Sequence, residues 1–135
     1  MGMIAFRLGY GRYGIIDADN PTGGINVTYG APTTATLTRS AINFSSTGNN
    51  TLIAGIALQT VRVHKLFFVA NADTTITFKN GTGTDLSGPM PIVANGSLTL
   101  DLDGEPWFIT SAGNGFVISQ SGTAQISGCV YYSQS

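Results

Sequence analysis

Histidine and cysteine are the side chains with which this chain could do acid–base or nucleophilic chemistry. The only histidine is His64, and the only cysteine is Cys129. On a regular strand His64 would share a face with Arg62 and Leu66, and no carboxylate lies near it in sequence. Cys129 has no basic neighbour that would favour the thiolate, and no serine lies in a Gly-x-Ser-x-Gly motif. Catalysis would require His64 to lie beside a carboxylate and a serine or cysteine, and the sequence shows no such set. We therefore predict that the protein is not an enzyme.

Three carboxylates alternate near the end of a predicted strand, at Asp101, Asp103 and Glu105. Carboxylate oxygens at such a spacing could hold calcium, but the remaining ligand positions of a twelve-residue calcium loop are missing. We therefore predict a solvated strand end, with no metal and no cofactor. Calcium binding at this turn is the alternative.

The charge content is unusually low. Lys, Arg, Asp and Glu make up 10% of the 135 residues, against about 25% in soluble domains, and the formal net charge is -1. The six basic residues are scattered, which argues against nucleic-acid binding. No apolar run is long enough to span a membrane, and the first ten residues do not form a secretory signal. We expect an exterior of Thr, Ser, Asn and Gly, which suits a protein packed against copies of itself or a larger structure.

Short β-branched and aromatic runs recur between Gly and Asn, and no window has helical periodicity, so the sequence predicts an all-β fold. The expected strands are Ala41–Phe44, Thr51–Ala54, Val61–Ala70, Thr74–Lys79, Met90–Val93, Leu98–Leu102, Trp107–Thr110, Phe116–Gln120 and Gln125–Tyr132. Asn-Gly pairs at residues 80–81, 95–96 and 114–115 are interpreted as hairpin turns, because both residues tolerate positive φ.

This number of short strands predicts a β-sandwich of jelly-roll or Greek-key type. An immunoglobulin-like sandwich is the alternative, and it is disfavoured because the paired cysteines that flank a core tryptophan are missing. One strand segment, Leu66–Ala70, is apolar on both faces. Its second face therefore needs cover from another element or another chain.

Residues 1–40 differ from the rest and are expected to form an extended N-terminal arm on a sandwich domain of residues 41–135. Glycine and proline interrupt any long element there, which leaves room for short strands at Ile25–Tyr29 and Thr34–Thr38. Tyrosine and arginine are favoured anchors at protein interfaces. The candidate partner-binding residues of the arm are Arg7, Tyr10, Arg12 and Tyr13.

A set of turn glycines, a Gly-Pro step and a Trp-Phe pair resembles a recurrent small β-sandwich of tailed-bacteriophage virion proteins. The segments that carry the resemblance are Phe78–Gly81, Leu86–Met90, Ala94–Gly96, Glu105–Phe108, Ala112–Gly115 and Ile126–Tyr131. The resemblance implies a jelly roll that assembles with itself, often as a homotrimer, and decorates or cements the capsid by binding the major capsid protein. It also implies a place on the capsid exterior after synthesis in the host cytoplasm, and it includes no catalytic residue.

A receptor-binding or carbohydrate-binding tip domain of a phage tail fibre or head fibre is the alternative function. It would require an exposed aromatic cluster or a polar pocket on the sandwich. The aromatic residues in the strands are expected in the core or at an interface, and not as a platform for ligands. These residues are Phe67, Phe68, Phe78, Trp107, Phe108 and Phe116.

Overall fold

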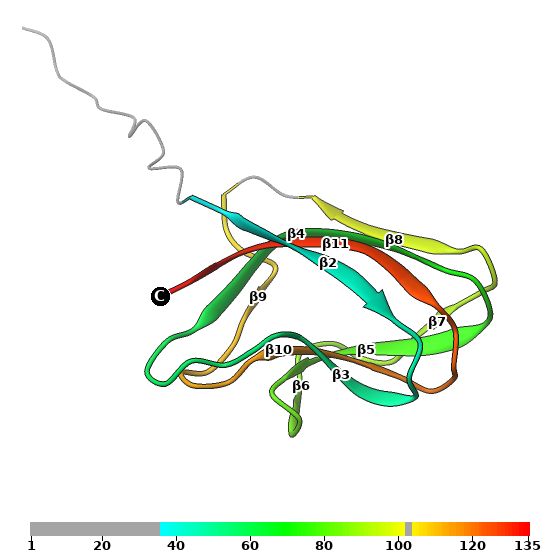
Figure 1. Cartoon of the computed structure of the whole chain (residues 1–135), viewed down its shortest axis with the longest axis horizontal. Coiled ribbons are helices and arrows are strands. Elements are labelled where there is room, and N and C mark those ends of the chain that lie inside the picture. Colours follow the sequence, from blue (N-terminus) through cyan, green and yellow to red (C-terminus); the bar gives the residue numbers. More distant parts are fainter. Residues whose placement is uncertain (1–35, 102–103) are drawn as a thin grey trace, which may run out of the picture. The chain divides into compact units, whose positions relative to one another are not determined.

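The described part of the protein, residues 36–101 and 104–135 of a computed structural model, is a β-sandwich. Two antiparallel sheets pack face to face, and no helix occurs among these residues (Figure 1), so the all-β prediction is confirmed. The strands are β2 (Thr38–Phe44), β3 (Gly48–Ile53), β4 (Val61–Ala70), β5 (Thr74–Asn80), β6 (Thr84–Asp85), β7 (Met90–Ile92), β8 (Ser97–Asp101), β9 (Phe108–Ile109), β10 (Phe116–Gln120) and β11 (Ile126–Gln134).

Strand order brings together segments that are far apart in sequence. The first sheet has the order β2-β11-β4-β8, and β9 also pairs with β4. The second sheet has the order β3-β10-β5-β6, and β7 also pairs with β5. Most consecutive strands therefore lie in different sheets, so the chain crosses repeatedly between the two layers.

Each of the nine predicted strands overlaps an observed one, and β2 begins earlier than expected, at Thr38. The two-residue strand β6 is missed because it is too short to show alternation. Of the expected short strands in the arm, Ile25–Tyr29 lies outside the described residues. Of Thr34–Thr38, residues 36 and 37 are not in a strand and Thr38 begins β2, while the first two residues lie outside the described part.

The hairpin interpretation holds for one of the three Asn-Gly pairs. Residues 80–81 lie in the β5–β6 hairpin, where Lys79 pairs with Asp85. The pairs at 95–96 and 114–115 connect strands of different sheets, so the hairpin prediction is wrong there. Residues 95–96 still form a tight turn, in which φ is 64° at Asn95. At 114–115 neither residue has a positive φ, and the turn lies just before the pair, with a φ of 86° at Gly113. A positive φ reverses the chain locally, but it does not determine which sheet the next strand joins.

A β-bulge in β4 changes which residues face the core. Tyr131 pairs with Lys65, but the next residue, Tyr132, pairs with Val63, so His64 is the extra residue. Val63 and Leu66 are therefore both buried. The expectation that His64 and Leu66 share a face is wrong, because the bulge shifts the alternation by one residue.

The core between the sheets is built from aromatic and branched side chains. Phe78, Phe108 and Phe116 form a cluster with ring centroids 4.9 to 5.7 Å apart. The buried core also contains Phe68 and residues of β2, β3, β5, β10 and β11, and partly buried leucines of β8 pack against it. Aromatic clusters of this kind add to the stabilisation from buried area, so the core holds the two sheets at a fixed separation.

Asn80 connects the β5–β6 hairpin to the loop after β9. Its side chain donates to Ser111 Oγ and accepts from Ser111 N and Asn114 Nδ2, at 2.9 to 3.0 Å. We expect Asn80→Ala to lower the free energy of unfolding by about 1 kcal/mol, because these bonds are exposed and water replaces them in part. Chemical denaturation measures this loss, and Asn49→Ala, at an exposed position of β3, is the matched control. A loss near zero would mean that the Ser111 loop is held by other contacts.

Candidate interaction face

The first sheet presents a regular array of side chains to the outside, which we call the outer face. Strand register arranges it in three rows across β2, β11, β4 and β8. The rows are Asn43–Ser127–Val69–Ser97, Ala41–Cys129–Phe67–Thr99 and Arg39–Tyr131–Lys65–Asp101. All twelve residues are exposed or half-buried, whereas the alternate residues of β4 and β11 face the core, as the two-residue period of a strand requires.

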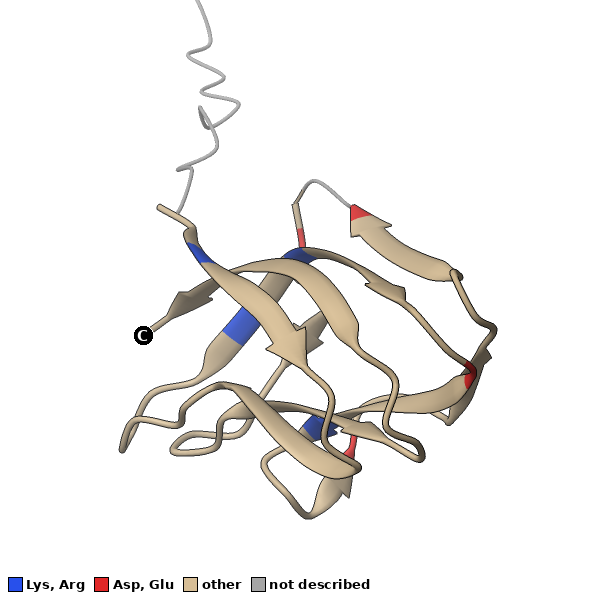
Figure 2. Ribbon diagram, turned by 45° about the vertical axis from the view of Figure 1, so that its right-hand side comes forward, with Lys and Arg blue, Asp and Glu red and all other residues tan. Residues whose placement is uncertain are grey.

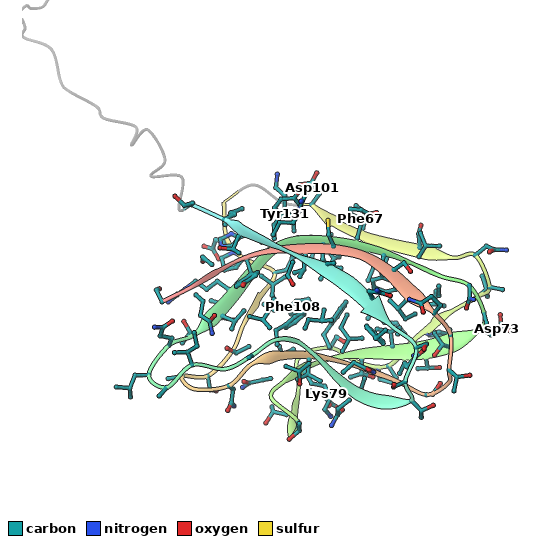
Figure 3. The ribbon with its side chains drawn as sticks, in the orientation of Figure 1. Phe67, Asp73, Lys79, Asp101, Phe108 and Tyr131 are labelled. Carbon is teal, nitrogen blue, oxygen red and sulfur yellow. The ribbon has the colours of Figure 1, made fainter. Side chains whose placement is uncertain are left out.

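An apolar patch lies at the centre of the outer face. Phe67 and Val69 of β4 are 47% and 44% exposed, and their neighbours in the same rows are small. Figure 3 shows Phe67 on the outside of the first sheet and Phe108 between the sheets. The sequence predicted that the second face of Leu66–Ala70 needs cover, and the structure leaves that face about half exposed.

The few basic residues are unevenly distributed between the two sheets (Figure 2). Arg39, Arg62 and Lys65 lie on strands of the first sheet, and Lys79 lies on the second. Lys65 Nζ is 3.4 Å from a carboxylate oxygen of Asp101, and Lys79 Nζ is 2.6 Å from one of Asp85. Since Arg39 lies on the edge strand β2 and Asp101 on the opposite edge strand β8, the outer face is positive at one edge and negative at the other.

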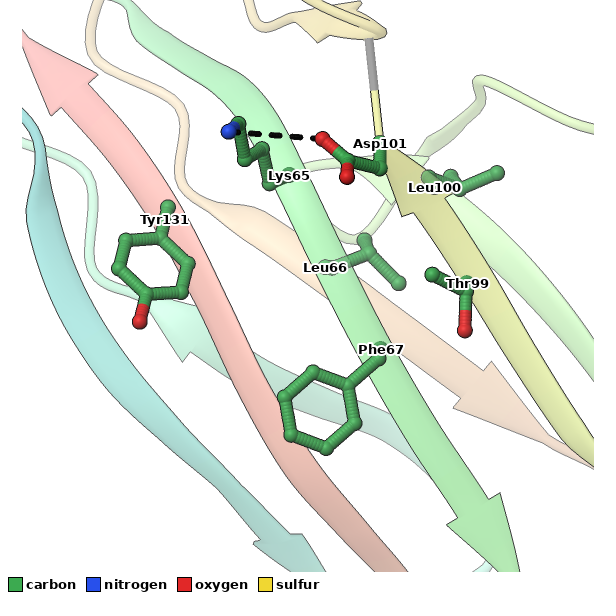
Figure 4. Close-up of a pocket in the computed structure, with 7 residues that line it drawn as sticks. All are labelled: Lys65, Leu66, Phe67, Thr99, Leu100, Asp101 and Tyr131. Carbon is green, nitrogen blue, oxygen red and sulfur yellow. Dashed lines mark ion pairs between the residues drawn. The ribbon is translucent and has the colours of Figure 1, made fainter.

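A shallow depression of about 180 Å³ lies on this face around Phe67, Tyr131 and the Lys65–Asp101 pair (Figure 4). Thr99 contributes a hydroxyl, and the walls are mostly apolar. Two aromatic rings beside a carboxylate and an ammonium group suit contact with another protein. The outer face of the second sheet differs, because its positions carry polar residues such as Asn49, Thr77 and Ser119.

His64 contacts one of the groups that catalysis would need. Its Nε2 is 3.3 Å from Ser133 Oγ, and Arg62 Nη1 donates to Ser135 Oγ at 3.0 Å. Within residues 36–101 and 104–135, no carboxylate hydrogen-bonds to the imidazole ring. A serine and a histidine without an orienting acid form only part of a triad. The prediction that the protein is not an enzyme stays a prediction.

Several predicted site residues cannot be placed. Arg7, Tyr10, Arg12 and Tyr13 lie outside the described residues, and so does Asp103. Asp101 pairs with Lys65, and Glu105 is exposed. No cluster of three metal-ligating side chains occurs in the described parts of the chain. The structure therefore does not test the partner-binding role of the arm or the calcium alternative.

The strand aromatics divide between the core and the surface. Phe68, Phe78 and Phe116 are buried, and Phe108 packs against them. Phe67 and Trp107 are 47% and 42% exposed. Tyr131 and Arg39 were not among the predicted contact residues, and the only signal for the outer face was the run Leu66–Ala70, which is apolar on both sides.

Neither the fold nor this face identifies a family. Among the described residues, the structure contains no helix whose length and hydropathy would let it cross a membrane. Comparisons of the chain with protein-family models, with curated proteins and with solved structures found no match.

Proposed function

We propose that the protein is a non-enzymatic virion structural protein that decorates or cements a phage capsid. The observation that carries this proposal is the outer face, where Phe67 and Val69 are about half exposed on a domain with few charges. An apolar patch on a weakly charged exterior favours coverage by other protein subunits. In this proposal the partners are the major capsid protein and further copies of the chain, for which the resemblance implies a homotrimer.

The strand order supports a jelly roll as the type of sandwich. Four long strands, β2-β11-β4-β8, lie opposite β3-β10-β5-β7, since β7 extends the second sheet beside β5. Two four-stranded sheets connected mainly by crossings between them are the arrangement of a double Greek key. An immunoglobulin-like sandwich would instead connect more of its neighbouring strands within one sheet.

The arm is the proposed grip on the major capsid protein. We expect that deletion of residues 1–20 leaves a folded protein that no longer binds capsids, because the tyrosine and arginine anchors are removed. Co-sedimentation with capsids that lack the protein measures this binding. The matched variant in the full chain replaces Arg7, Tyr10, Arg12 and Tyr13 by alanine, and it should lose binding to a similar degree. Full retention of binding by both variants would remove the arm from the proposal.

The position of the protein on intact particles tests the virion role directly. Electron microscopy or immunolabelling should place it on the capsid exterior. In this proposal the chain is synthesised in the host cytoplasm before it joins the particle. Labelling confined to the tail would contradict the decoration role and favour the receptor-binding or carbohydrate-binding tip domain. The depression beside Phe67 and Tyr131 is the observation that supports this second candidate, since aromatic rings stack on sugars. A glycan array distinguishes the two, and Tyr131→Ala should abolish any sugar binding that it detects.

A further inference from the structure

The outer face is complementary to itself. We propose that two copies of the chain pack outer face to outer face about a two-fold axis parallel to the strands, between β11 and β4. A two-fold contact uses the same surface on both copies. If residue i of the first copy contacts residue j of the second, then residue j of the first copy also contacts residue i of the second. This proposal goes beyond the virion role and depends only on the described residues of the first sheet.

The position of the axis determines which residues meet. Rotation about an axis parallel to the strands reverses the order β2-β11-β4-β8 on the second copy. Each β2 therefore lies opposite the β8 of the other copy, and each β11 lies opposite β4, at the same row. The register of the three rows then gives the contacts directly.

Charge complementarity favours this axis. In the row Arg39–Tyr131–Lys65–Asp101, each Arg39 lies opposite Asp101 of the other copy, and each Tyr131 lies opposite a Lys65. Asp101 already pairs with Lys65 of its own chain at 3.4 Å, and its carboxylate has acceptor sites for an arginine as well. A tyrosine ring opposite an ammonium group adds a cation–π contact. At both edges of the face, a charged residue therefore lies opposite a residue of opposite charge.

Side-chain size is matched in the same way. The large residues of the outer face, Phe67 and Val69, lie on β4, and their neighbours on β11 are Cys129 and Ser127. Reversal of the strand order places each large residue opposite a small one. Figure 4 shows the Phe67 ring leaning from β4 toward β11, so the two rings would meet near the axis. Facing sheets pack about 10 Å apart, which leaves room for side chains that interdigitate in this manner.

A two-fold axis perpendicular to the strands does not give complementary contacts. A two-fold axis across the strands would place each strand on its own copy and would set Arg39 opposite Asn43, with Asp101 opposite Ser97. That arrangement pairs neither charge. A trimer, which the resemblance implies, would have to use another surface, because a two-fold contact joins copies in pairs.

Charge reversal in the full chain tests the proposal. In a homodimer of the Arg39→Asp variant, a carboxylate at position 39 lies opposite Asp101 at two sites. In a homodimer of the Asp101→Arg variant, a guanidinium group at position 101 lies opposite Arg39 at two sites, so each variant places like charges together. We expect each single variant to weaken dimerisation about tenfold or more in sedimentation equilibrium. An equimolar mixture of the two variants should regain the wild-type dissociation constant, because both contacts of the mixed dimer are then attractive. Native mass spectrometry identifies that mixed dimer.

The ion pair on the second sheet provides the controls. Lys79→Asp and Asp85→Arg make comparable charge changes away from the outer face and should leave dimerisation unchanged. Cys129 gives an independent readout, since it is the only thiol and lies beside the axis, so dimerisation should slow its alkylation. A wild-type chain that is monomeric at all concentrations would overturn the proposal. An oligomer that is insensitive to both reversals, or a mixture that does not recover, would overturn it as well. Capsid binding is a separate assay, so the virion role can fail without affecting this result.

Discussion

Replacement of Phe68 by alanine is expected to lower the free energy of unfolding by about 3–5 kcal/mol. Phe68 is 0% exposed and lies in the core cluster, so the truncation leaves a cavity among well-packed neighbours. A small domain has a total stability of about 5–15 kcal/mol, so the variant would retain only part of it. Urea denaturation followed by tryptophan fluorescence measures the change.

The adjacent residue is the matched control. Phe67 lies on the same strand but faces outward and is 47% exposed. We expect Phe67→Ala to cost about 1 kcal/mol or less in the monomer, and to weaken the proposed dimer instead. Equal losses for the two variants would contradict the assignment of the two faces of β4.

The strand pattern was predictable because β-branched residues alternate with polar ones over most of the chain. Thr74–Asn80 is an example, where Thr74, Ile76 and Phe78 are buried and the residues between them are not. Strand pairing was not predictable, because β2 and β11 are neighbours in space but lie at opposite ends of the described chain. The Asn-Gly pairs at 80–81 and 95–96 mark turns correctly. A turn, however, has the same local chemistry whether it connects strands of one sheet or of two.

The candidate face was only partly predictable. The run Leu66–Ala70 indicated a strand that needs cover on both sides. The structure leaves its outer face about half exposed, so cover of that face stays a prediction. The bulge at His64 could not be read from the sequence, because an extra residue leaves no mark in the hydrophobic pattern until the partner strand is known. Arg39 and Tyr131 gave no signal either, and Asp101 stood out only as a possible calcium ligand. Their arrangement in one row follows from pairing among strands distant in sequence.

Substitution of Gln120 is the second change for which we expect a large loss of stability. This side chain is 2% exposed, and it connects one end of the second sheet to the loops beside it. Its Nε2 donates to the carbonyl oxygens of Ser46 and Ala124, at 3.1 and 3.0 Å, and its Oε1 accepts from Thr74 Oγ1 at 3.1 Å. A buried amide with all of these partners satisfied fixes how the loops close over the end of the core.

We expect Gln120→Leu to lower the free energy of unfolding by about 2–4 kcal/mol, although leucine is similar in volume and more apolar. The substitution removes the amide from the Ala124 carbonyl oxygen and the Thr74 hydroxyl, whereas the Ser46 carbonyl oxygen keeps Asn50 Nδ2 as a donor. The desolvation cost of the buried groups that lose this partner exceeds the gain from burying a leucine. Gln125→Leu is the matched control: Gln125 donates to Asn43 Oδ1, Ser127 Oγ and the carbonyl oxygen of Ile126 from a half-buried position. Water can replace those bonds, so its loss should stay near 1 kcal/mol or below. If thermal and chemical denaturation gave Gln120→Leu a stability equal to the wild type, the core would tolerate an apolar side chain there, and the amide would have no part in closing this end of the sandwich.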